Sequence, residues 1–160
     1  MIEFDANKCF PQPSRLGLSA KSPESYPEAE GKYGILVADG DPGVRSLLNK
    51  GLQGQGFDVW LAADGQEALE LFWRHHETID LVLLDVCMPG LDGPQTATAL
   101  QQLKPRIRFC FMSGDLGGYT DRKLRDLGAL AVIPKPFRLV EAAPLLWQLA
   151  GRADLCPVSV

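Results

Sequence analysis

The 160-residue sequence lacks any apolar run approaching the roughly 18 residues that a helix needs to cross a bilayer. Its first ten residues, MIEFDANKCF, carry acids where a secretory signal has Lys or Arg, and no apolar segment follows them. These two absences favour a protein without a membrane span. The expected location is cytoplasmic.

Cysteine and histidine are also scarce. The two histidines, His75 and His76, are adjacent and cannot share a helix face, so we expect them at a solvated helix end. The four cysteines include no CxxC pair and no metal-binding spacing: Cys9, Cys87, Cys110 and Cys156. Reduced thiols of a cytoplasmic protein are the expectation.

Positive charge is in deficit. The chain has 16 Lys and Arg against 20 Asp and Glu, which gives a net charge of -4 and a pI near 5.1. A nucleic-acid surface spread over the whole protein is therefore not expected, and neither is direct DNA binding.

The apolar pattern divides the chain into three parts. Residues 1–33 are rich in Pro, Ser and charge without an apolar period, which predicts a flexible N-terminal tail. Residues 34–150 alternate apolar runs with helical patterns and predict a single domain. Residues 151–160 are expected to be a short C-terminal tail, too short to form a further effector domain.

Within the central part, strands alternate with helices. The expected strands are 33–39, 57–63, 79–85, 107–112 and 130–133; the expected helices begin near Pro42, Gly65, Pro94, Thr120 and Leu139. Strands that are apolar on both faces and alternate with helices indicate a parallel sheet covered by helices. The predicted fold class is α/β, a three-layer, doubly wound (βα)5 arrangement with a five-stranded parallel sheet.

Local signals refine the helices. Asp41 before Pro42 is typical of a helix start, and the run from Asp64 to Glu67 is a capping-box pattern. The apolar face with Leu69, Phe72 and Trp73 is expected to be core rather than a cofactor pocket. Pro144 lies inside the last helical pattern and predicts a kink there. Asp92-Gly93 is expected to be a turn before a helix.

Four polar residues stand at predicted strand ends: Asp39, Asp85, Ser113 and Lys135. The carboxyl ends of parallel strands meet at one edge of the sheet, so these side chains are expected to converge. Two carboxylates and a cation are costly to bury together unless a ligand or mutual pairing compensates. Such a set can support phosphoryl transfer to an aspartate, in which a metal, a lysine and a hydroxyl bind the phosphoryl oxygens.

The segment from Ile35 to Trp147 resembles the receiver domain of two-component response regulators. ILVADGDPGVR is similar to the first strand and acidic loop of that family, and DLVLLDVCMPGLDG to its phosphorylation segment. CFMSGD is similar to its fourth strand and VIPKPF to its lysine-proline turn. The resemblance implies a flavodoxin-like fold of the kind found in stand-alone, chemotaxis-regulator-like receivers.

The resemblance also implies roles for individual residues. Asp85 matches the phosphoacceptor, Asp39 an acid that binds Mg²⁺, and Cys87 the position whose backbone carbonyl binds the metal. Ser113 matches the switch hydroxyl and Lys135 the phosphate-contacting lysine. The implied partners are a histidine kinase or phosphotransfer protein and a downstream protein. The protein would catalyse only its own phosphoryl transfer and dephosphorylation, and so would not be an enzyme in the usual sense.

Two positions depart from the family pattern. Receivers usually carry a second acid that binds the metal after the first strand, and here Gly40 takes its place, which predicts weakened Mg²⁺ binding. Asp41 is one position further on; it either reaches the metal, through water or a shifted loop, or caps the first helix. Val132 stands where many receivers place a Tyr or Phe that reports the state of the switch hydroxyl.

Two functional classes remain, a working phosphoacceptor and a degenerate receiver, and two further interpretations are disfavoured. Gly40 and Val132 favour a degenerate receiver, a constitutive interaction module that needs no phosphorylation. An aspartate-nucleophile phosphatase is weaker, because such enzymes commonly need a second aspartate at position 87, which is Cys. A flavodoxin-like nucleotide binder would need a Gly-rich phosphate loop, and DGDPGV is not one.

Overall fold

A computed structural model of the chain describes residues 32–151. The predicted tails at 1–33 and 151–160 lie outside the described residues except at their inner ends. There, Tyr33 packs edge-on against Trp147 with ring centroids 5.0 Å apart, and its carbonyl accepts a hydrogen bond from the Asp58 amide at 3.0 Å. Gly151 belongs to the last helix.

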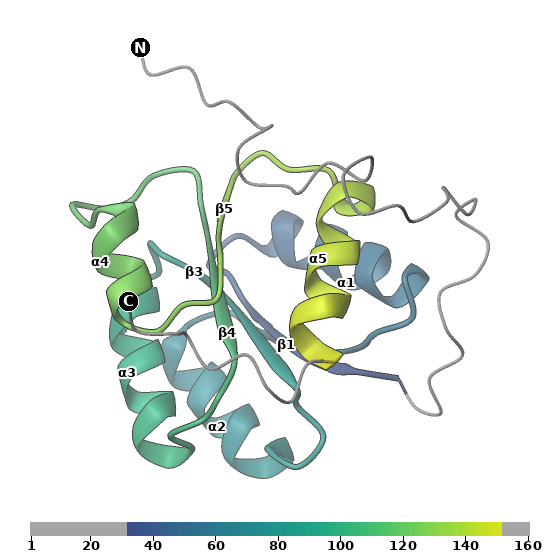
Figure 1. Cartoon of the computed structure of the whole chain (residues 1–160), viewed down its shortest axis with the longest axis horizontal. Coiled ribbons are helices and arrows are strands. Elements are labelled where there is room, and N and C mark those ends of the chain that lie inside the picture. Colours follow the sequence, from purple (N-terminus) through teal and green to yellow (C-terminus); the bar gives the residue numbers. More distant parts are fainter. Residues whose placement is uncertain (1–31, 152–160) are drawn as a thin grey trace, which may run out of the picture. The chain divides into compact units, whose positions relative to one another are not determined.

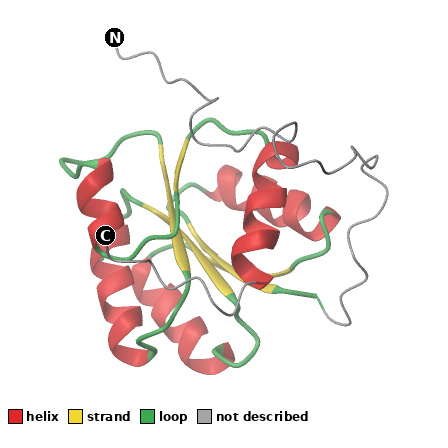
Figure 2. Cartoon of the chain, in the orientation of Figure 1, coloured by secondary structure: helices red, strands yellow, loops and turns green. Residues whose placement is uncertain are grey.

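The described residues form one parallel sheet covered by helices on both faces (Figures 1 and 2). The strand order is β2-β1-β3-β4-β5. The strands are β1 (Gly34–Ala38), β2 (Asp58–Ala62), β3 (Leu81–Asp85), β4 (Phe109–Ser113) and β5 (Val132–Pro134). The helices are α1 (Pro42–Gly54), α2 (Gly65–His75), α3 (Gly93–Leu103), α4 (Asp121–Asp126) and α5 (Leu139–Gly151). The predicted doubly wound fold is confirmed.

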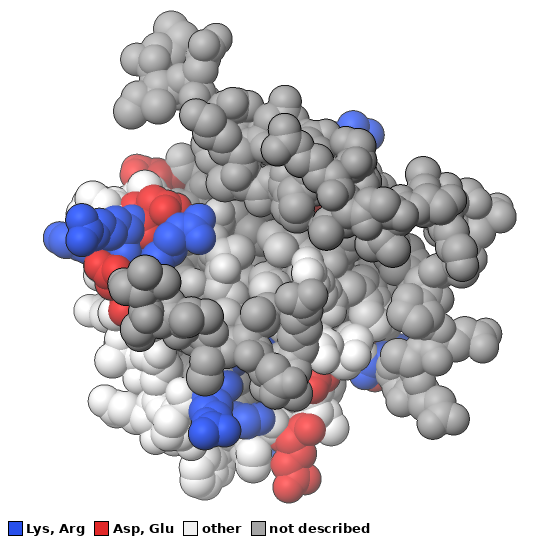
Figure 3. All heavy atoms as spheres, in the orientation of Figure 1, with Lys and Arg blue, Asp and Glu red and all other residues white. Residues whose placement is uncertain are grey.

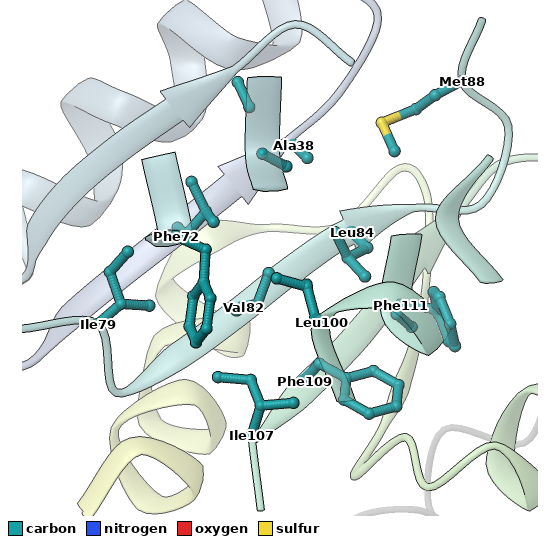
Figure 4. Packing of buried hydrophobic residues seen from close by; sticks show 14 of the residues in the cluster. Ala38, Phe72, Ile79, Val82, Leu84, Met88, Leu100, Ile107, Phe109 and Phe111 are labelled. Carbon is teal, nitrogen blue, oxygen red and sulfur yellow. The ribbon is translucent and has the colours of Figure 1, made fainter. Parts of the chain in front are cut away.

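Alternation along the strands divides the core into two clusters. In β3, Leu81 and Leu83 belong to the cluster with α1 and α5, and Val82 and Leu84 to the cluster with α2, α3 and α4. Figure 1 shows these two helix groups on opposite sides of the sheet. Figure 4 shows the second cluster, where Phe72 lies over the strands. The continuous apolar run of β3 thus reflects burial on both faces.

Aspartates begin three of the helices. Asp41 accepts from the amides of Gly43 and Val44 at 2.7 and 3.2 Å, which confirms it as the cap of α1. Asp64 caps α2 by accepting from the Glu67 amide at 2.8 Å. The predicted capping box is only half present, because the Glu67 carboxylate accepts from the amide of Ala63 instead.

The outer face of α2 differs from the expectation. Phe72 is 1% exposed and lies in the core, and Leu69 packs against it partly buried. The prediction that Trp73 belongs to the core is wrong, because Trp73 is 70% exposed. Consecutive helical residues point about 100° apart, and since Phe72 points into the core, Trp73 lies at the edge of the buried face and turns to solvent. His75 and His76 are exposed at the end of α2, as expected.

Two other features concern the last elements. Helix α5 is continuous across Pro144, where the sequence predicts a kink. Pro144 is exposed, and so is Val140 one turn earlier, whose carbonyl loses its helical partner to the proline. Strand β5 begins at Val132, two residues later than expected, although the Leu130 amide already donates to the Phe109 carbonyl at 2.9 Å.

Charged side chains are concentrated on one part of the surface of the described residues. Side chains of both charges gather over α4, which carries Asp121, Arg122, Lys123, Arg125 and Asp126 (Figures 1 and 3). Arg125 and Asp121 pair there at 2.7 Å. No helix within residues 32–151 combines the length and apolar character that crossing a membrane requires.

Adjacent positions on α2 offer a direct test of this packing. Phe72→Ala should lower the free energy of unfolding by about 3–5 kcal/mol, because it leaves a cavity in the core. Trp73→Ala, a change at an exposed site, should change it by no more than about 0.5 kcal/mol. Chemical denaturation of both variants measures the difference; equal losses would contradict the placement of Trp73.

Candidate functional site

The polar strand ends meet where the strand order reverses. Strand β1 lies between β2 and β3, so the chain switches direction across the sheet at the β1–β3 boundary. Asp39 follows β1, and Asp85 is the last residue of β3. In parallel α/β sheets the carboxyl ends of the strands at such a switch form the usual ligand site. The two carboxylates stand on either side of it.

Asp39 is almost completely enclosed, and each of its polar groups has a partner. Asp39 is 1% exposed. Its amide donates to the Ala62 carbonyl at 3.2 Å, and its carbonyl accepts from Arg45 Nη1 at 2.7 Å. The Asp41 amide donates to Oδ1 at 2.9 Å, and Lys135 Nζ donates to Oδ2 at 2.6 Å. The side chain therefore has one fixed orientation.

Lys135 joins the two acids. Its Nζ lies 2.6 Å from Asp39 Oδ2 and 3.0 Å from Asp85 Oδ1. The lysine follows β5, and its amide donates to the Ser113 carbonyl at 2.8 Å, which ties the end of β5 to the end of β4. One ammonium shared by two carboxylates leaves the cluster with one net negative charge.

Burial and the neighbouring charges shift the pKa values of Asp85 and Lys135. Burial raises the pKa of Asp85 above its usual value; the hydrogen bond from Lys135 lowers it in part, and the charge of Asp39 raises it again. Burial acts against the charge on Lys135, but the hydrogen bonds to Asp39 and Asp85 outweigh it and raise the pKa of Lys135. An ion pair alone would lower the pKa of the acid, so the desolvation of Asp85 outweighs its pairing.

Ser113 and Cys87 flank the cluster. Ser113 ends β4, is 7% exposed, and donates its hydroxyl proton to the Asp115 carbonyl. Cys87 Sγ lies 3.4 Å from the same carbonyl. Loss of hydration raises the pKa of Cys87, and the charges of Asp115 and Asp85 raise it further, so the side chain is a neutral thiol.

The geometry agrees with a known family. A model of the response regulator receiver domain matches residues 35–143. The chain belongs to this family. Receiver domains are signalling modules of two-component systems; they bind Mg²⁺ at the phosphorylation site and interact with histidine kinases or phosphotransfer proteins.

Sequence relatives agree with this assignment. The receiver is 36% identical over 109 residues to sporulation initiation phosphotransferase F of Bacillus subtilis, a match that covers 67% of this chain and 85% of that protein. It is 42% identical over 106 residues to transcriptional regulatory protein CpxR of Escherichia coli, covering 64% of this chain and 43% of CpxR. Sensor kinase CckA of Brucella abortus is 31% identical over 134 residues, covering 84% of this chain and 14% of the kinase.

Solved structures agree as well. Response regulator protein TrrA of Thermotoga maritima, in complex with Mg(2+)-BeF, superimposes with a TM-score of 0.65 and 30% identity, over 73% of this chain and 98% of that one. The non-phosphorylated HemR receiver domain of Leptospira biflexa gives a TM-score of 0.66 and 28% identity, over 76% and 96%.

The acidic loop of this receiver has room for the missing acid. Gly40 is exposed, and a Cβ placed on it would come no closer than 3.4 Å to Pro89 Cδ. Asp41 does not replace the acid by position, because its Oδ1 caps α1. Within residues 32–151 no three His, Cys, Asp or Glu side chains gather closely enough to hold a metal ion. Asp39 and Asp85 still bring two carboxylates together, and carboxylate oxygen is a ligand type that suits Mg²⁺.

Arg45 is a contributor that the sequence analysis missed. It lies on α1, one turn after the cap, and holds the Asp39 carbonyl at 2.7 Å. Its position one helical turn beyond an acidic loop is a signal that sequence inspection can use. A fixed Asp39 backbone is required for the carboxylate to face Lys135.

The raised pKa of Asp85 has a measurable effect on stability. The folded protein binds this proton more tightly than the unfolded chain, so Asp85 adds stability below its unfolded pKa of 3.8 and loses it as the pH rises through the folded value. Asp85→Asn should therefore raise the Tm of the metal-free protein at neutral pH, and the difference should vanish in acid. Thermal melts across this range test it. Asp58→Asn, at an exposed carboxylate, should show little difference.

Proposed function

We propose that Asp85 is the phosphoacceptor of this receiver and takes a phosphoryl group from a phosphohistidine of a histidine kinase or phosphotransfer protein. The observation that carries the proposal is the shared Lys135 ammonium, which holds Asp85 beside Asp39 at the switch in strand order. The side chain of Asp85 is 13% exposed, so an incoming phosphoryl group can reach it.

The proposed reaction is a displacement at phosphorus. A carboxylate oxygen of Asp85 forms the new bond to phosphorus, while the bond from phosphorus to the imidazole nitrogen breaks and its electron pair stays on the imidazole. Lys135 stabilises the negative charge on the phosphoryl oxygens. Ser113 supplies a hydroxyl at the end of the neighbouring strand, where it donates to one of those oxygens. Hydrolysis of the acyl phosphate returns Asp85 to the carboxylate, which limits catalysis to this cycle.

Magnesium would be held by Asp39, Asp85 and the backbone carbonyl of Cys87. When bound, the ion neutralises the phosphoryl oxygens and orients the group for in-line transfer. Gly40 withholds one carboxylate, so we infer that binding is weaker than in receivers with an acid there. Asp41 is left to contribute through water, because its side chain already caps α1.

The net charge of the chain and its sequence relatives bear on what the domain acts on. The net charge of -4 gives no support to direct DNA binding, so a downstream protein is the proposed target, or a second phosphotransfer step. The match to a phosphotransferase along 85% of its length supports the second option. We place the protein in the cytoplasm because Cys87 and Cys110, the cysteines among residues 32–151, are both free thiols.

A second candidate is a phosphorylation-independent interaction module. Two observations favour it: Gly40 removes a metal ligand, and Val132 occupies the position of the reporting aromatic. The complete set of Asp39, Asp85, Ser113 and Lys135 favours the phosphoacceptor over this module.

Intact mass decides between the two. After incubation with Mg²⁺ and acetyl phosphate, the parent protein should gain the mass of one phosphoryl group and Asp85→Asn should gain none. The matched control is Asp64→Asn, which keeps the cap of α2 and should be phosphorylated like the parent. No gain in the parent, with an established receiver phosphorylated in parallel, would favour the interaction module.

Metal affinity tests the role of Gly40. Gly40→Asp should lower the Mg²⁺ dissociation constant by at least roughly tenfold, because it adds a carboxylate ligand where there is space for one. Isothermal titration calorimetry measures this constant without any phosphodonor.

Gly40→Asn is the matched control, since it has the same shape without the charge. It should leave the constant close to the parent value. An unchanged constant in Gly40→Asp would mean that Gly40 is not the weak point of the site.

A further inference from the structure

Two loops beside the cluster are joined through one carbonyl group. The β4–α4 loop (residues 114–120) and the β3–α3 loop (residues 86–92) both follow strands that end at the site. The Asp115 carbonyl accepts the Ser113 hydroxyl and lies 3.4 Å from Cys87 Sγ. The position of this carbonyl in the β4–α4 loop therefore decides where the Ser113 hydroxyl points.

Tyr119 fixes the far end of the same loop. Its hydroxyl donates to Asp92 Oδ2 at 2.9 Å, and its ring packs against the core cluster on the side of α2, α3 and α4. Asp92 is held in turn, because its Oδ1 accepts from the Gln95 amide at 2.8 Å at the start of α3. The loop is thus tied to a helix end by a hydrogen bond between two side chains.

Between these two attachments the loop is held by contacts of its own. The Gly117 amide donates to Asp115 Oδ1 at 3.0 Å, the Tyr119 amide donates to the Leu116 carbonyl at 2.8 Å, and Leu116 packs against the core cluster. Gly117 and Gly118 have φ angles of 54° and 86°, a region that glycine adopts at low cost. A Cβ on Gly117 would come within 2.7 Å of Cys87 Sγ, so the glycine lets the loop close onto the thiol. S–H···O contacts are weak, and the turn hydrogen bonds lie within the loop itself, so the Tyr119–Asp92 hydrogen bond is the polar side-chain contact that ties the loop to the start of α3.

The Ser113 hydroxyl has one proton and can donate it to one acceptor. In this structure that acceptor is the Asp115 carbonyl. To donate to a phosphoryl oxygen on Asp85, Ser113 must give up Asp115. A loop held in place by Tyr119 therefore favours the state in which the Ser113 proton is donated to the Asp115 carbonyl.

We propose that Tyr119 is a positioning residue that, through its hydrogen bond to Asp92, keeps the β4–α4 loop closed and the Ser113 hydroxyl on the Asp115 carbonyl in the unphosphorylated protein. Phosphorylation draws Ser113 away and loosens the loop. This inference rests on the proposed role of Asp85. In this chain Tyr119 would then be the aromatic residue linked to the state of the Ser113 hydroxyl, since position 132 is Val.

The first test is the rate of phosphorylation by acetyl phosphate. Tyr119→Phe removes only the hydroxyl, and loss of one hydrogen bond should raise the rate by about two- to tenfold. In a Ser113→Ala background the same change should have no effect, because Tyr119 acts through the Ser113 hydroxyl. Tyr33→Phe, remote from the site, is the matched control and should leave the rate unchanged. A lower or unchanged rate, or an equal increase in both backgrounds, would overturn the proposal.

Asp92→Ser provides a second variant. Serine can still cap α3 but lacks the second oxygen that Tyr119 binds. It should raise the rate as Tyr119→Phe does, and the double variant should be no faster than either single variant. Additive effects would show that the two residues do not act as a pair.

The second test needs no phosphoryl transfer. Alkylation by iodoacetamide, followed by peptide mass mapping of the full chain, reports how closely the loop lies on Cys87, which is exposed but whose Sγ is 3.4 Å from the Asp115 carbonyl. Tyr119→Phe should raise the Cys87 rate several-fold, whereas Cys110, which is 0% exposed, should stay unmodified and so confirm the fold. An unchanged Cys87 rate would overturn the closed loop even if the parent is phosphorylated. A parent that takes no phosphoryl group would instead overturn the proposed function.

Discussion

The ammonium of Lys135 is the interaction on which the site depends. The carboxylates of Asp39 and Asp85 lie at the ends of neighbouring strands, where they repel each other and lose hydration. The single ammonium of Lys135 offsets the repulsion and the lost hydration. Lys135 must reach these carboxylates across the sheet, since β5 is separated from β3 by β4 and from β1 by two strands. Strands lie about 4.8 Å apart, so the contact needs a long side chain at the rim. The hydrogen bond from the Lys135 amide to the Ser113 carbonyl fixes the point from which it reaches out.

Lys135 neutralises only one of the two carboxylate charges, and the remaining negative charge favours a cation as ligand. Burial raises the pKa of Asp85 in spite of its ion pair with Lys135, and the negative charge of Asp39 raises it further. A divalent cation would more than neutralise the remaining negative charge. Gly40 sets the limit, because a third carboxylate would deepen the negative charge and Gly40 provides none. Under the proposed ligand assignment, the site has the charge that attracts Mg²⁺ and one carboxylate fewer to hold it.

Sequence reasoning was most successful where single elements decide the outcome. Apolar runs end at Asp39, Asp85 and Ser113, and a parallel sheet must bring such ends together, so the cluster could be predicted before any coordinates. The buried face of α2 was predicted less well. Phe72 and Trp73 are adjacent and point about 100° apart, and Trp73 is the one that faces solvent.

Contacts across loops were not predicted at all. The bond from Tyr119 to Asp92 spans 27 residues and depends on glycine conformations at 117 and 118 that no local pattern reveals. Such a contact is decided by tertiary packing, which propensity and periodicity do not describe. The hydrogen bond from Arg45 to the Asp39 carbonyl was also missed, although it is local and lies one helical turn beyond the acidic loop.

The two oxygens of Asp92 serve different partners, one the helix and one the loop. Breaking the contact with Tyr119 leaves the first turn of α3 with its cap. Opening the loop and fraying the helix are therefore independent events with separate free energies. The loop can move on the fast timescale of surface segments, while the helix stays folded and keeps its share of the core in place.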